Sequence, residues 1–214
     1  PISSNEKFSI LKDIKQKGQY HIIASAGEID MTKYKSKFNN IGLGTRVITG
    51  AQIQRYYITD TPSQGNVIYI NDQNKPGLSS KREQEVSNPR IVLQRITGVD
   101  SKVRIISTLI NGHMYCANST NYIANDNSIN IKYLLGVLNS SLVNFFIKQT
   151  STNTNITAKV LNSIPIIFPS TKMQEAIIRI VDYVLIIKSL PSDIIIDQYV
   201  DLSLIHISEP TRPY

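Results

Sequence analysis

Glutamine, arginine and tyrosine side chains that could hydrogen-bond to a polar ligand gather in one short segment, Gln52 to Tyr57. A glutamine amide pairs bidentately with adenine, and an arginine guanidinium pairs bidentately with guanine or with a phosphate. In an extended strand, a period of two would separate Gln54 and Tyr56 from Arg55. One face of such a strand would pack on the core, and the sequence leaves open which face that is.

Basic residues are concentrated around this segment. Between residues 33 and 104 there are twelve basic and five acidic residues, so this part of the chain carries the whole net charge of +7. A concentrated positive charge attracts a polyanion by neutralising phosphates and releasing counterions. The alternative is a solvated basic face that only aids solubility.

The polar loop from Thr150 to Lys159 is a second candidate for phosphate contact, because its side chains are short and polar and one cation follows them. A plain capping and turn segment explains the loop equally well. The full set of candidate DNA-binding residues is Gln52, Gln54, Arg55, Tyr56, Lys81, Arg82, Arg90, Arg95, Lys102, Arg104, Asn153, Asn155 and Lys159.

Motifs for catalysis are missing from the sequence. Gly42 and Gly44 lack the third glycine of a dinucleotide fingerprint. His113 and Cys116 have metal-ligand spacing, but no second pair completes a zinc site. We therefore expect no catalytic residue, no metal and no cofactor in this segment.

Cysteine usage and hydropathy bear on the compartment. With the single cysteine Cys116 no internal disulfide can form, which favours a reducing, cytoplasmic location. No run approaches the roughly 20 apolar residues of a membrane span, so we expect no membrane partner.

Short runs of β-branched and aromatic residues between residues 20 and 131 predict strands. The expected strands are 21–24, 46–48, 54–58, 67–70, 90–94 and 103–106. The polar stretch from Asn71 to Ser87 indicates a long exposed loop, on which Lys81 and Arg82 could meet a phosphate.

After residue 131 the apolar residues recur at three and four positions, which predicts a helix. Leu134, Leu138 and Leu142 share one helical face, and Ser128 or Asn130 could cap the start of that helix. Asn139 and Ser140 would then lie in mid-helix, where anchoring a neighbouring strand by hydrogen bonds is a better explanation than DNA contact.

A second helix is predicted from Thr171, where Thr171 and Gln174 match a capping box, to a point before Pro191. The sequence thus predicts an α+β fold: a β-rich domain followed by two helices that are separated by a polar loop and a short strand.

Domain boundaries are expected as an entry linker and domain start at 1–30, a recognition domain at 31–190 and a tail at 191–201. Residues 202–214, LSLIHISEPTRPY, resemble a translated sequencing adapter, so we expect a non-native tail there. A start at Pro1 indicates a fragment.

Three segments resemble the TaqI-like C-terminal specificity domain of restriction-modification enzymes. They are GEID through GAQIQRYYI (27–58), PRIVLQRI (89–96) and YLLGVLNSSLVNFF (133–146), continuing to LNSIPI (161–166) and QEAI (174–177). The resemblance covers roughly residues 8 to 190, and its helical segment is the most specific. It implies a sequence-specific domain that binds double-stranded DNA.

The resemblance also implies a parent enzyme. An upstream S-adenosylmethionine-dependent domain would methylate adenine N6, with magnesium only if a nuclease domain is attached. One alternative is a fragment of a type I specificity subunit, whose helix, loop and IPI order is similar. An alternative from another class is a protein-interaction domain that uses the helix at 171–190.

Overall fold

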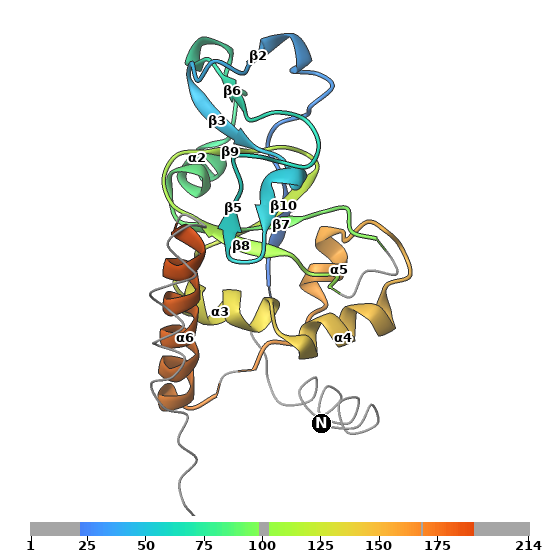
Figure 1. Ribbon diagram of the computed structural model, residues 1–214, viewed down its shortest axis with the longest axis vertical. Coiled ribbons are helices and arrows are strands. Elements are labelled where there is room, and N and C mark those ends of the chain that lie inside the picture. Colours follow the sequence, from blue (N-terminus) through green and yellow to red (C-terminus); the bar gives the residue numbers. More distant parts are fainter. Residues whose placement is uncertain (1–21, 99–102, 168, 191–214) are drawn as a thin grey trace, which may run out of the picture.

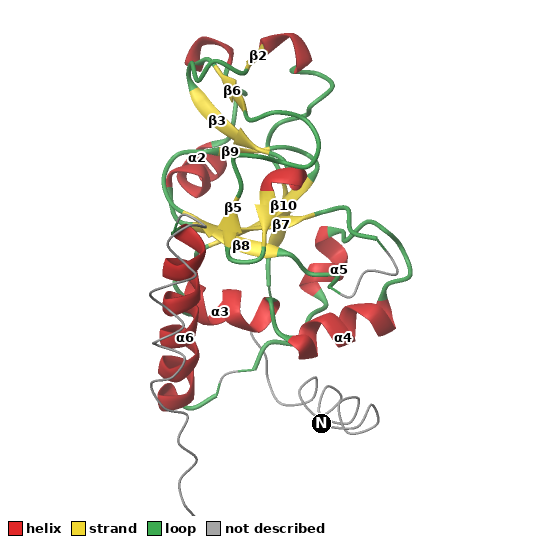
Figure 2. Cartoon of the chain, in the orientation of Figure 1, coloured by secondary structure: helices red, strands yellow, loops and turns green. Residues whose placement is uncertain are grey.

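The structure, a computed structural model, describes residues 22–98, 103–167 and 169–190 (Figure 1). A β-rich part and a helical part follow one another along the long axis of the molecule (Figure 2). This arrangement confirms the predicted α+β class, with most of the helices after the strands. The expectations for residues 1–21, for the tail at 191–214 and for Lys102 lie outside the described residues.

A four-stranded antiparallel sheet occupies the middle of the molecule. In spatial order its strands are β1 (Ala24–Ala26), β10 (Thr120–Ala124), β7 (Arg90–Gln94) and β8 (Ser107–Ile110). Strand β7 is buried on both faces: Ile91 and Leu93 pack toward the helices, and Val92 lies in a cluster with Ile48 and Cys116 of the second four-stranded sheet. The prediction of a strand at 90–94 is confirmed, but the one at 103–106 is wrong because pairing begins at Ser107.

A second sheet lies at the far end of the β-rich part. Its strands, in order, are β2 (Phe38–Asn39), β6 (Ile68–Ile70), β3 (Thr45–Ile48) and β9 (Tyr115–Cys116). β3 pairs in parallel with β9, and the other pairs are antiparallel. The expected strands at 46–48 and 67–70 correspond to β3 and β6.

The single strand expected at 54–58 is instead part of a β-hairpin with a two-residue turn. The 3-10 helix η2 (Gly50–Gln52) leads into β4 (Ile53–Gln54), which pairs with β5 (Tyr57–Ile58). Arg55 and Tyr56 form the turn, and Tyr56 has a φ of +70°. A left-handed residue other than glycine is uncommon, so the alternation along the sequence did not reveal this turn.

The sequence predicted a long loop from Asn71 to Ser87. The structure instead has the helix α2 (Ser80–Ser87) in the second half of this stretch. The Ser79 hydroxyl accepts a bond from the Arg82 amide and caps the helix. Val86 is buried against the second four-stranded sheet, and this tertiary contact holds a short helix whose sequence is otherwise polar. Two further 3-10 turns are η1 (Lys35–Lys37) and η3 (Asp72–Asn74).

Four helices pack beneath the central sheet (Figure 1). They are α3 (Ile131–Leu138), α4 (Ser141–Thr150), α5 (Ala158–Asn162) and α6 (Thr171–Ser189). The side chain of Asn130 caps α3, which confirms one of the two predicted caps. The short strand expected before the last helix is replaced in part by α5.

The long helix predicted across Asn139 and Ser140 is broken at these residues. Ser140 caps α4 by accepting a bond from the Val143 amide. The Asn139 amide group exchanges bonds with Ser107, donating to its carbonyl at 3.0 Å and accepting from its hydroxyl at 3.1 Å. Asn139 therefore anchors the edge strand β8, which confirms its predicted structural role.

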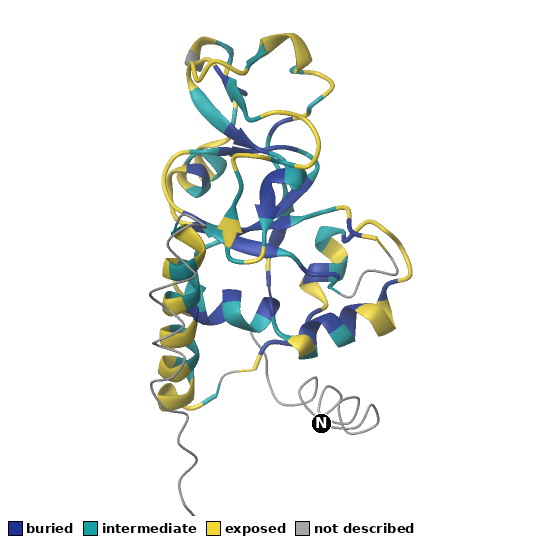
Figure 3. Ribbon diagram, viewed as in Figure 1, coloured by how far each residue is buried: buried dark blue, intermediate teal, exposed yellow. Residues whose placement is uncertain are grey.

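The last helix begins at Thr171 as predicted, although Ser170 is the capping position and Gln174 donates to the Pro169 carbonyl. It packs against α3 where Gly136 allows close approach: a Cβ there would lie 2.9 Å from Val181 Cγ2. Its other face is exposed along its length (Figure 3). That face carries the apolar residues Met173, Ile180, Tyr183 and Ile186.

Candidate nucleic-acid interface

A groove of about 620 Å³, lined by both apolar and uncharged polar residues, lies where the hairpin, β7 and the loop after β5 meet. We call it the polar groove. Its lining is Met31, Thr49, Gly50, Ala51, Gln54, Ser63, Gln64, Gly65, Asn66, Ile68, Gln94, Ile96 and Ser119. Amides and hydroxyls supply its polar atoms, and no charged residue of the described part of the chain lines it. Such a surface can exchange neutral hydrogen bonds with a ligand.

Three polar side chains of the groove differ in how many of their hydrogen-bonding atoms are already used within the protein. Gln94 donates its Nε2 to the Ile53 carbonyl at 2.7 Å. Ser119 accepts the Gly50 amide at 3.1 Å. The Gln54 amide has no hydrogen bond to any described residue, while its backbone is held in the hairpin. Gln54 is thus positioned by its main chain and free at its side chain.

A smaller hollow of about 280 Å³ adjoins the other side of the hairpin, and we call it the cationic hollow. Arg55 and Lys148 line it together with Val103, Asn139, Ser141, Asn144 and Phe145. The Arg55 guanidinium donates to the Asn139 carbonyl at 2.5 Å, at the break between α3 and α4. Gln54 and Arg55 are neighbours in the chain, so the polar groove and the cationic hollow flank the hairpin on its two sides.

The loop that carries Asn153 and Asn155 borders the polar groove through Ile96. Ile96 forms an antiparallel bridge with Asn155, and the Ile156 amide donates to the Arg95 carbonyl at 2.7 Å. The buried Arg104 guanidinium holds the same loop by donating to the carbonyls of Ser151 and Asn153. Both asparagine side chains are exposed, on a loop that is tied at both of its sides.

Several of the residues predicted from the sequence remain available at the surface. Gln54 and Arg55 lie on the hairpin, Asn153 and Asn155 on the loop, and Lys159 is exposed on α5. Tyr56 and Arg95 are half-buried, and Arg95 donates to the Asn118 carbonyl at 3.1 Å. Lys81 and Arg82 lie apart from these on α2, where Lys81 approaches Glu85 at 3.9 Å.

Three predicted contact residues are buried instead: Gln52, Arg90 and Arg104. Gln52 accepts the Thr49 amide and closes a capping box, Arg104 holds the asparagine loop, and Arg90 forms a buried ion pair. Their burial corrects the expectation that these side chains contact DNA. Long-range packing decides this burial, and a strand's composition does not reveal it.

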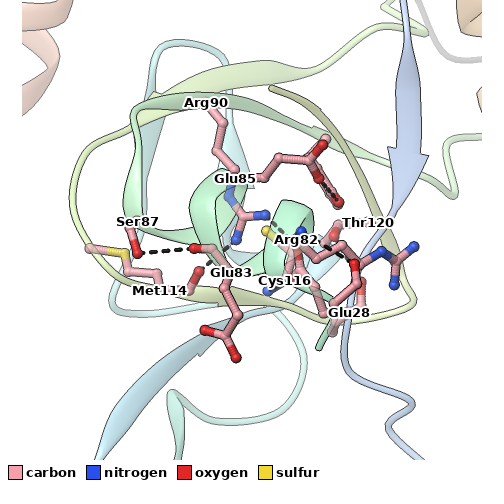
Figure 4. Close-up of polar contacts among 12 residues, drawn as sticks. Glu28, Arg82, Glu83, Glu85, Ser87, Arg90, Met114, Cys116 and Thr120 are labelled. Carbon is pink, nitrogen blue, oxygen red and sulfur yellow. Dashed lines mark hydrogen bonds and ion pairs between the residues drawn. The ribbon is translucent and has the colours of Figure 1, made fainter. Parts of the chain in front are cut away.

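Arg90 lies at the centre of a closed polar cluster (Figure 4). Its guanidinium pairs with Glu28 and donates to the Met114 carbonyl at 2.6 Å. Glu28 also accepts the Cys116 amide at 2.8 Å. Burial raises the pKa of the Cys116 thiol to about 12, so this cysteine is a packed, protonated side chain. The cluster joins β7 to β9 and is structural.

Sequence reasoning missed Lys148 and most of the polar groove. Lys148 follows Ser141 and Asn144 at helical spacing, and this polar face was the available signal. Gln64, Asn66 and Gln94 come from separate strands and loops, so only the tertiary structure brings them together.

Metal-binding and membrane-spanning features are both absent from the described residues. The residues that the structure describes contain no group of three or more side chains suited to hold a metal ion. Across the same residues, no helix has the length and apolar character needed to cross a membrane.

Comparison with known proteins identifies the family to which this chain belongs. The model of the TaqI-like C-terminal specificity domain family matches residues 45–166. No curated protein matches the chain.

Solved structures of restriction-modification proteins also match the chain. The type IIL restriction-modification enzyme MmeI, solved in complex with DNA, has a TM-score of 0.50 and 13% identity, over 91% of this chain and 27% of that one. The HsdS subunit from Thermoanaerobacter tengcongensis has a TM-score of 0.48 and 15% identity, over 88% of this chain and 49% of its own. A chain of a type I R-M system has the same TM-score and identity, over 83% and 45%. The present chain spans less than half the length of each.

The family match assigns this chain to the class of DNA target-recognition domains. The chain belongs to the TaqI-like C-terminal specificity domain family, whose members serve restriction-modification systems.

Proposed function

We propose that this domain selects the DNA sequence for a restriction-modification enzyme by docking the polar groove against the edges of the base pairs. The observation that carries this proposal is the groove itself, where the hairpin holds the Gln54 main chain and no described residue bonds to its side-chain amide. Base edges are read by hydrogen bonds, whereas phosphate contacts set position and orientation.

The cations around the groove supply the phosphate contacts. Arg55 and Lys148 share the cationic hollow, and Lys159 is exposed on α5 near the asparagine loop. Duplex DNA carries a negative charge every 1.7 Å or so along its axis, so these side chains would raise affinity for any sequence.

For the whole enzyme, we propose an adjoining methyltransferase that modifies adenine N6 with S-adenosylmethionine. Base-flipping enzymes enclose the duplex in a cleft, and this domain would form the wall opposite the catalytic domain. Cleavage, with magnesium, would require a further nuclease domain. A type I specificity subunit would use the same domain with a separate methyltransferase subunit.

One feature favours a protein contact as a second function. Ile180, Tyr183 and Ile186 are exposed by 63%, 48% and 57% on α6. Exposed apolar residues on one helical face commonly mark a protein contact. The mass of the 214-residue chain in solution, measured by light scattering after size exclusion, tests self-pairing: a strict monomer excludes it.

The proposed DNA binding is tested by fluorescence anisotropy of the 214-residue chain with a mixed-sequence duplex across salt concentrations. We expect affinity to fall linearly on a log–log plot, with a slope of about 0.9 per phosphate contact. The Arg55→Ala variant should bind less tightly, and Lys172→Ala, on exposed α6, should not. No binding at low salt would contradict the proposal.

A further inference from the structure

We propose that the polar groove reads an adenine–thymine base pair in the major groove, with Gln54 as the bidentate partner of the adenine. This inference rests on the proposed function and names the base that the site takes. Adenine presents N7 as an acceptor and N6 as a donor in the major groove, and a glutamine amide matches both.

Gln54 has the required freedom. Its side chain is half-buried in the groove wall, and no described residue uses its amide oxygen or nitrogen. Its main chain pairs with Tyr57 in the hairpin, so the side chain starts from a defined position. Neither amide atom of Gln54 is among the buried atoms that lack a partner, so both are open to solvent and a base that bonds to both atoms can replace water there.

The hydrogen bonds of Gln94 and Ser119 within the protein determine whether each side chain presents a donor or an acceptor to the groove. A carbonyl only accepts, so the Gln94 atom 2.7 Å from the Ile53 oxygen must be the nitrogen, which leaves the amide oxygen for the groove. That oxygen can accept from an exocyclic amino group. The Ser119 oxygen accepts the Gly50 amide, so its hydrogen is available as a donor. The groove thus offers both an acceptor and a donor beside Gln54.

Charge and shape favour adenine–thymine over guanine–cytosine. The commonest reader of guanine is an arginine or lysine that donates to O6 and N7. No residue that lines the groove carries a charge within the described part of the chain. Ile96 also lines the groove and is 62% exposed, and an apolar side chain of this kind fits against the C5-methyl group of thymine.

The test begins with selection of the bound fraction from a random duplex pool, followed by sequencing. The wild-type chain, Gln54→Ala and the matched control Gln84→Ala, an exposed glutamine on α2, are compared. We expect the wild type and the control to enrich one motif with an invariant adenine–thymine pair. Gln54→Ala should lose roughly tenfold discrimination at that pair alone. Circular dichroism shows whether the variants are folded.

Replacing that adenine by 7-deazaadenine removes the N7 acceptor and keeps Watson–Crick pairing. We expect the wild type to bind the modified duplex less tightly and Gln54→Ala to bind both duplexes alike. An enriched motif that Gln54→Ala reads unchanged, or equal losses with 7-deazaadenine in both proteins, would overturn this inference and leave the proposed function standing. Absence of any binding would overturn both.

Discussion

Glu28 and Arg90 form an ion pair in which both side chains are completely buried. The pair connects the segment after β1 to the central strand β7, and the Arg90 guanidinium lies 4.6 Å from the centre of the Tyr122 ring. A buried charge that loses its partner is strongly destabilising, even where the intact pair contributes little net stability.

The variant Glu28→Gln keeps the shape of the side chain and leaves Arg90 uncompensated. We expect the free energy of unfolding to fall by about 3–5 kcal/mol, measured by urea denaturation. The matched control is Asp60→Asn, because Asp60 is 77% exposed where it pairs with Arg46. That exposed pair should be worth less than about 1 kcal/mol. Equal losses in the two variants would contradict the structural role of the buried pair.

Close approach of α3 and α6 depends on Gly136. A Cβ at this position would lie 2.9 Å from Val181 Cγ2 and 3.0 Å from Ile177 Cγ2. We therefore expect Gly136→Val to destabilise the chain by about 1–3 kcal/mol through overpacking, with a lower thermal midpoint. Gly77→Ala is the control, since no atom lies within 4 Å of a Cβ there. A thermal midpoint of Gly136→Val as high as that of the control would refute the packing of α6 on α3.

Cys116 should be unreactive in the folded chain. Burial raises its pKa from 9.0 to about 12, and the thiolate is the reactive form. A colorimetric thiol reagent at pH 8 should label Cys116 only after unfolding in urea. Fast labelling of the native chain would show that β9 is open to solvent.

The raised pKa of Cys116 also implies that the stability of the folded chain depends on pH. The folded state holds the proton more tightly than the unfolded state, so stability is fully present below pH 9 and is lost as the pH rises toward 12. Burial also raises the pKa of Tyr122, which adds to the loss in alkali. Urea titrations at pH 8 and pH 10.5 should show the decrease, and Cys116→Ala should reduce it. A stability curve that Cys116→Ala leaves unaltered would exclude this thiol as a cause.

Lys148 is expected to contact one phosphate from the cationic hollow. The Lys148→Ala variant should reduce the salt dependence of DNA binding by about 0.9 on a log–log plot, uniformly across sequences. Lys172→Ala, which removes an exposed lysine from the first turn of α6, serves as the control in the same anisotropy titration. If the slope is unchanged by Lys148→Ala, the cationic hollow does not touch the DNA backbone.

Local sequence patterns predicted much of this fold. The run at 90–94 is β-branched and apolar and forms the buried strand β7. Asn130 caps α3, and the last helix starts at Thr171, because caps and helical periodicity depend on residues within a few positions of each other. The concentration of basic residues indicated a polyanion partner, and the segment at 133–146 resembles the family whose model matches the chain.

The tertiary structure alone decided which polar residues face solvent. Arg90 and Arg104 have the same side chain as Arg55, yet they are buried because distant groups hold them: Glu28 pairs with Arg90, and the carbonyls of the asparagine loop accept from Arg104. The turn at Tyr56 likewise depends on a left-handed backbone that no local pattern marks. Composition determines what a side chain is able to do, whereas long-range contacts determine whether it is free to do it.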